Sequence, residues 1–92
     1  MTASKAISLD KSGEWVPVGM APALLGAFGD ELTFVIAEQA PDPDDRAGFI
    51  LRFGSSPVVI PTHGRIWARA SVGSRNARGV IASLSTAEEE EL

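Results

Sequence analysis

The chain has 92 residues, of which 45% are apolar, and its formal net charge is −4. This length fits one domain, and the apolar fraction excludes a wholly disordered chain. Because the chain contains no cysteine, disulfide bridges and thiolate metal sites are excluded.

Residues 1–5 are expected to form a flexible lead-in that lacks the apolar segment of a secretory signal. Alternating apolar residues indicate a short strand at Ala6–Leu9, and a turn leads from it to a second strand at Glu14–Gly19. We expect these two strands to pair as a hairpin. Pro17 cannot donate a hydrogen bond to a sheet, so the second strand is predicted to lie at an edge or to contain a bulge.

The next two segments differ in how clearly they indicate a strand. Ala21–Phe28 is an apolar run too short to distinguish a buried strand from a helical turn, although Pro22 and Gly26 favour an irregular strand. Leu32–Glu38 is the most β-prone segment of the chain. It is predicted to be a central strand whose apolar side consists of Leu32, Phe34 and Ile36.

The second half of the chain continues the pattern of short strands and turns. The prolines and aspartates of residues 39–48 predict a loop. Strands are then expected at Phe49–Phe53, Val58–Ile60, Arg65–Ala70 and Ala77–Leu84. The last two are expected to pair as a hairpin.

The strand within Gly64–Ala70 is the clearest of all. A period of two places Ile66, Ala68 and Ala70 on one side, and Arg65, Trp67 and Arg69 on the other. A tryptophan between two arginines is compatible with stacking on a ligand, but a buried ring in a strand covered on both sides is the simpler interpretation. We therefore expect Trp67 to be buried and the arginines to make surface contacts.

Together these segments predict an all-β protein, a small antiparallel β-sandwich or barrel of about seven or eight short strands. The domain is expected to span residues 6–84. Residues 85–92 form an acidic tail, for which a short helical turn capped by Ser85 and Glu88 and a solvated chain are both compatible with the sequence.

Charge is strongly segregated along the chain. Residues 1–46 carry eight acids and three bases, residues 47–84 carry five arginines and no acid, and residues 88–91 are four glutamates. The halves either neutralise each other within one folded chain or pair between copies, where opposite charges fix the orientation of the contact.

The sequence contains no catalytic constellation. His63 is the only histidine, and no carboxylate or nucleophile is adjacent to it, so an enzyme is not expected. Asp42, Asp44 and Asp45 have the ligand type for calcium but not the loop spacing. We expect no metal and no cofactor. The acidic balance argues against nucleic acid as a partner, and no apolar run is long enough to span a membrane.

Three stretches, Glu14–Val18, Ala40–Asp45 and Gly64–Ala70, resemble the small β-sandwich proteins among the structural components of tailed bacteriophages and gene-transfer particles. The resemblance implies a non-enzymatic virion protein of the head-decoration, head-fibre or tail-accessory type, made in the bacterial cytoplasm and located in the virion. It also implies a symmetric homo-oligomer, with a trimer as one candidate, that attaches to capsid or tail proteins. Host surface glycans are a further candidate partner.

In this interpretation, arginines of one copy contact carboxylates of a neighbour. The candidate assembly residues are Arg65, Arg69, Arg75 and Arg78 on the basic side, and Asp42, Asp44 and Asp45 on the acidic side. The alternative is a small carbohydrate-binding or other ligand-binding β module that uses an exposed tryptophan.

Overall fold

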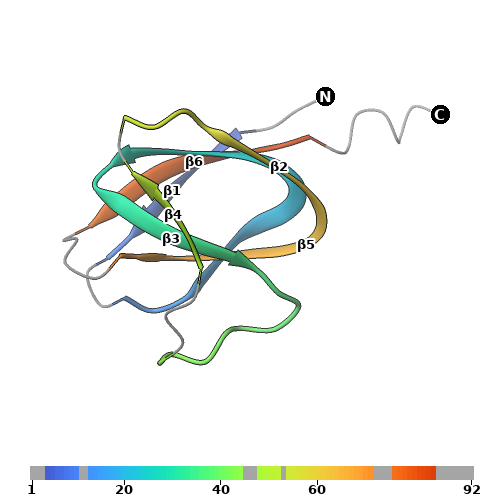
Figure 1. Cartoon of the computed structure of the whole chain (residues 1–92), viewed down its shortest axis with the longest axis horizontal. Helices are drawn as coiled ribbons and strands as arrows, with labels where there is room; N and C mark the ends of the chain where they lie inside the picture. The colour runs from blue at the N-terminus through green and yellow to red at the C-terminus, as the bar shows by residue number, and fades with distance from the viewer. Residues whose placement is uncertain (1–3, 11–12, 45–47, 53, 72–75, 85–92) are drawn as a thin grey trace.

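The computed structural model describes residues 4–10, 13–44, 48–52, 54–71 and 76–84, and these residues form an all-β fold without a helix (Figure 1). The strands are β1 (Ser4–Leu9), β2 (Val16–Gly29), β3 (Glu31–Ile36), β4 (Phe49–Arg52), β5 (Val58–Ala70) and β6 (Ala77–Ser83). The predicted all-β class is confirmed. The predicted number of seven or eight strands is not, because six strands are present in the described part of the chain.

The difference in number arises because β2 and β5 are long. The predicted strands Glu14–Gly19 and Ala21–Phe28 both fall largely within β2, and Val58–Ile60 and Arg65–Ala70 both fall within β5. Each long strand continues through a proline, Pro22 in β2 and Pro61 in β5. Shifts of register between β2 and β5 after Pro17 and around Pro22 absorb the missing backbone donors, as β-bulges do.

All six strands belong to one antiparallel sheet with the order β1-β6-β2-β5-β3-β4. The two long strands curve around the molecule (Figure 1). The sheet therefore curls, and strands that are not neighbours in it approach each other: β2 contacts β4, and β3 contacts β6.

This order corrects both predicted hairpins. β1 pairs with β6 rather than with β2, and β5 pairs with β2 and β3 rather than with β6. The reason is the composition of β2, whose side chains are all apolar or absent. A strand of this kind buries most apolar surface when it has a neighbouring strand on both sides. β2 therefore lies between β5 and β6 rather than at an edge. The bulge predicted for Pro17 is present.

The core lies on the inner side of the curled sheet. Its most fully buried large side chains are Leu25, Leu32 and Ile66, from three different strands. The apolar sides predicted for β3 and β5 are confirmed: Leu32 and Phe34 are buried, Ile36 packs against the core, and Ile66, Ala68 and Ala70 are buried. β3 has a strand on either side, as predicted.

The predicted end segments are only partly covered by the described residues. β1 begins at Ser4, inside the predicted lead-in. Residues 1–3 and the acidic tail, 85–92, lie outside the described residues.

Candidate assembly surfaces

The outer side of β2 is apolar and open. The buried inner positions Ala21, Ala23, Leu25 and Ala27 alternate with five outward positions, which are Met20, Pro22, Leu24, Gly26 and Phe28. Met20 is 56% exposed and Phe28 is 46% exposed. Sequence reasoning missed this surface, although a run of 14 residues without one polar side chain was the signal. Such a strand is typical of a sheet that is covered on both faces.

Neighbouring strands extend this surface. Leu24 lies opposite Val59 of β5 and Ala82 of β6, and Gly26 lies opposite Val80 of β6, which in turn lies opposite Ala6 of β1. Val59 is 61% exposed. We name this surface the outer apolar face; it consists of Ala6, Met20, Pro22, Leu24, Gly26, Phe28, Val59, Val80 and Ala82.

Two of the predicted assembly arginines lie at opposite ends of the outer apolar face. Arg65 is opposite Met20, and the guanidinium carbon of Arg78 lies 5.7 Å from the ring centre of Phe28. Both arginines are exposed. No aspartate or glutamate occurs in β2, β5 or β6, but Asp30 directly follows β2 and lines the same hollow as Arg78, so both signs of charge occur at the end near Phe28.

Arg69, in contrast, is held within the chain. Its guanidinium carbon lies 4.8 Å from the ring centre of Trp15, and its Nη2 donates to the carbonyl oxygen of Pro43 at 3.3 Å. The half-buried Arg69 side chain thus joins the segment before β2 to the acidic loop between β3 and β4. Its role is at least partly internal, since a cation over an aromatic ring and a charge-assisted hydrogen bond are both stabilising.

The acidic candidates lie in that loop. Asp42 and Asp44 are exposed, and Asp42 Oδ1 accepts a hydrogen bond of 2.8 Å from the backbone N–H of Asp44. Within the described part of the chain, neither carboxylate pairs with Arg65 or Arg78. Asp45 and Arg75 lie outside the described residues.

Trp67 is buried, as predicted, with 8% of its surface exposed. It packs on the side of β5 opposite the main core, and its indole Nε1 donates to the carbonyl oxygen of Ala37 at 2.9 Å. Trp15 is half-buried beneath Arg69, and its Nε1 is buried without a hydrogen-bond partner among the described residues. Trp67 therefore offers no open face for stacking on a sugar, and Arg69 covers one face of Trp15.

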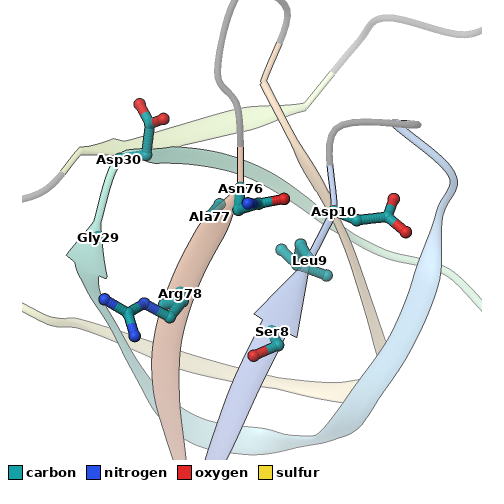
Figure 2. Close-up of a pocket in the computed structure, with 8 residues that line it drawn as sticks. All are labelled: Ser8, Leu9, Asp10, Gly29, Asp30, Asn76, Ala77 and Arg78. Atoms are coloured by element: carbon teal, nitrogen blue, oxygen red, sulfur yellow. The ribbon is translucent and has the colours of Figure 1, made fainter.

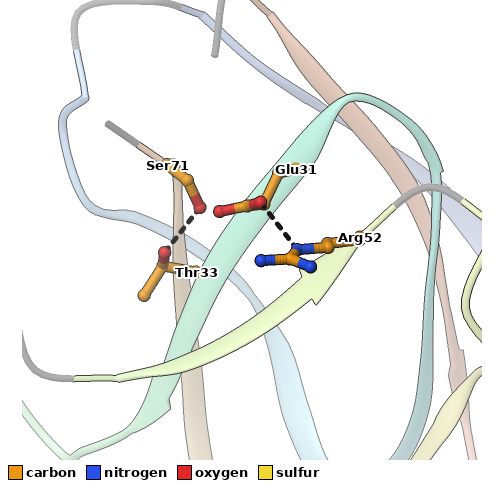
Figure 3. A network of polar contacts seen from close by, with 4 residues as sticks. All are labelled: Glu31, Thr33, Arg52 and Ser71. Carbon is orange, nitrogen blue, oxygen red and sulfur yellow. Dashed lines mark hydrogen bonds and ion pairs between the residues drawn. The ribbon is translucent and has the colours of Figure 1, made fainter. Parts of the chain in front are cut away.

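A polar network fixes the start of β3 (Figure 3). Thr33 Oγ1 and the Ser71 hydroxyl are 2.7 Å apart and buried, and the Ser71 backbone N–H donates to the Glu31 carbonyl oxygen at 3.0 Å. Arg52 Nε donates to Glu31 Oε1 at 3.1 Å. Arg52, another arginine of the basic half, is therefore paired within the chain.

An open hollow of about 930 Å³ lies where β1 and β2 end and β6 begins (Figure 2). Its lining is mostly polar and consists of Ser8, Leu9, Asp10, Gly29, Asp30, Asn76, Ala77 and Arg78. In Figure 2 the charged groups of Asp10, Asp30 and Arg78 point in different directions rather than toward one point. The hollow therefore lacks the converging polar groups of a built ligand site.

His63 is exposed on β5. No group of three or more histidines, aspartates and glutamates within the described ranges is placed to hold a metal ion. None of the described segments is a helix with the length and apolar character needed to cross a membrane.

Comparison of the chain with protein-family models, curated proteins and solved structures finds no match.

Proposed function

We propose that this protein is a non-enzymatic assembly subunit that binds other copies of itself and other proteins through its surface. The observation that carries the proposal is the outer apolar face, because the most apolar strand of the chain is covered on one side only. Soluble proteins rarely leave a contiguous apolar patch of this kind uncovered unless it is an interaction site.

We propose the virion of a tailed bacteriophage or gene-transfer particle as its location. Support comes from the resemblance of Glu14–Val18, Ala40–Asp45 and Gly64–Ala70 to small β-rich virion proteins. The test is the set of genes that flank the coding sequence. Capsid, portal or tail genes on either side would support a virion role, and a set of metabolic genes on both sides would count against it.

We further propose that the curled sheet acts as a small barrel-like shell around one core. The approaches of β2 to β4 and of β3 to β6 support this description. A shell of this kind presents its outer side to partners, as the assembly role requires.

Charge pairing between copies is the second part of the proposal. Arg65 and Arg78 are exposed, and so are Asp42 and Asp44 in the loop between β3 and β4. Within the described residues, these two arginines form no ion pair with these two aspartates. A neighbour that supplied carboxylates to the arginines would fix the orientation of the contact. Such pairs weaken as salt rises, because exposed charges are screened.

The double substitution of Arg65 and Arg78 by Ala tests this pairing. We expect self-association, measured by light scattering across a salt series, to weaken and to lose most of its salt dependence. Arg52→Ala is the matched control, since Arg52 pairs with Glu31 of its own chain. Unchanged association and salt dependence in the double variant would refute charge pairing.

A further inference from the structure

The outer apolar face has the chemistry of an interface centre. Its central residues, Leu24, Gly26, Val80 and Ala82, have no charged or hydrogen-bonding side chain. Depletion of charge at the centre and a charged rim are the usual anatomy of a protein interface. Here the rim groups are Arg65 and Arg78.

The size of this face suits contact with one further copy of a small chain. Along β2, the eight steps from Met20 to Phe28 span about 26 Å at a rise of roughly 3.3 Å. Four strands about 4.8 Å apart give a width of about 19 Å. Each copy thus presents about 500 Å², and burial of the whole face in both copies would remove about 1,000 Å² from water, the lower limit for a specific interface.

The arrangement of large and small side chains on the outer apolar face is self-complementary. Small residues alternate with large ones across the strands: Ala82 lies opposite Leu24, and Ala6 lies opposite Val80. When two sheets pack face to face, large side chains of one sheet fill the gaps over small residues of the other. A surface that carries both types satisfies this requirement with a second copy of itself related by a twofold axis.

We propose that a second copy of this chain covers the outer apolar face, with β2 facing β2 about a twofold axis. The inference rests on the proposed assembly function and specifies the partner at one of its surfaces. Apolar burial holds this contact, so it does not weaken as salt rises, whereas the pairing of arginines with carboxylates does.

Site-directed cross-linking tests the twofold geometry, and the absence of native cysteine makes single-cysteine variants unambiguous. Ala82→Cys places a thiol near the centre of the face, and Ala40→Cys, the matched control, places one in the exposed loop between β3 and β4. A bismaleimide with a span of about 10 Å matches the distance between packed sheets. We expect Ala82→Cys to yield covalent dimer at least about tenfold faster than Ala40→Cys. Equal rates would overturn the inference.

Val59→Asp supplies the second measurement. Val59 is exposed in the single chain, which therefore tolerates a charge there, whereas the same charge is unfavourable when a second copy buries it. We expect this variant to keep the circular dichroism spectrum of the parent chain and to become monomeric in light scattering. A parent chain that stays monomeric at high micromolar concentration overturns the inference, while the assembly function survives if the chain binds another protein. Monomer that binds vesicles of anionic phospholipid through this face would also overturn it.

The two variants also distinguish the two contacts. If the double variant R65A/R78A abolished self-association and Val59→Asp left it unchanged, the charge contact would be supported and the twofold contact refuted. The two proposals therefore fail under different outcomes.

Discussion

Arg69 illustrates how one side chain changes meaning once its surroundings are known. In the sequence it is equivalent to Arg65, four positions earlier on the same side of the strand. In the structure Arg69 lies over Trp15 and binds the Pro43 carbonyl, whereas Arg65 is exposed. The contrast follows from loops distant in the sequence, so no local pattern distinguishes the two arginines.

The buried pair of Thr33 and Ser71 permits a quantitative test at the residue scale. Thr33→Val keeps the shape of the side chain but leaves the Ser71 hydroxyl without its partner at 2.7 Å. We expect a loss of about 1–3 kcal/mol in the free energy of unfolding, measured by urea titration.

The double variant T33V/S71A removes both hydroxyls and completes the cycle. Its loss in the free energy of unfolding should be smaller, by about 0.5–3 kcal/mol, than the sum of the losses of Thr33→Val and Ser71→Ala. The reason is that no hydroxyl is left without a partner in the double variant. Strict additivity would contradict a direct hydrogen bond between the two groups.

At the scale of elements, β2 and β6 approach so closely that a methyl group matters. A Cβ added at Gly79 would collide with the backbone carbonyl oxygen of Gly26, which cannot move without breaking the sheet. We therefore expect Gly79→Ala to lower the free energy of unfolding by about 1–3 kcal/mol.

Gly26→Ala is the matched control, because its Cβ would lie 3.6 Å from Pro57, an ordinary contact. We expect a change of less than about 1 kcal/mol, measured by thermal unfolding at low protein concentration. If both variants unfolded alike, the close approach of β2 and β6 would be wrong.

The inner sides of β3 and β5 were predictable because each follows from a period of two over consecutive residues, such as Ile66, Ala68 and Ala70. The length of β2 was not predictable from the sequence, since Pro22 indicates an interruption. Only the pairing with β5 shows that the strand continues. The outer apolar face was missed for the same reason: in the sequence, Ala21–Phe28 is ambiguous between a strand and a helical turn, and two faces can be assigned only to a strand.

At the scale of the whole molecule, strand order could not be inferred from chain order. The hairpin expected for β5 and β6 requires only a short connection. However, β2 lies between them, because it buries most apolar surface when it has two neighbours. The candidates Arg65, Arg78, Asp42 and Asp44, all exposed in the structure, were identified from charge segregation together with the resemblance to virion proteins. Neither of these requires knowledge of the topology.

The sheet order predicts how local stability is distributed. β2 and β5 have hydrogen-bonded neighbours on both sides, whereas β1 and β4 are edge strands. We expect amides of β2 and β5 to exchange with solvent more slowly than those of β1 and β4 by at least about tenfold, equivalent to roughly 1.4 kcal/mol of opening free energy. Hydrogen exchange followed by NMR measures this difference, and protection in β4 as high as in β5 would contradict the order.

The central place of β2 has a consequence for the order of events at the ribosome. β2 is complete at Gly29, but its two neighbours begin only at Val58 and Ala77. The most apolar strand of the chain is therefore synthesised long before either neighbour that will satisfy its backbone, and pairing of this long-range kind is slow and prone to aggregation. A chain released before Ala77 has no β6 to complete the sheet, so we expect truncated products to be substrates for chaperones and proteases rather than folded protein.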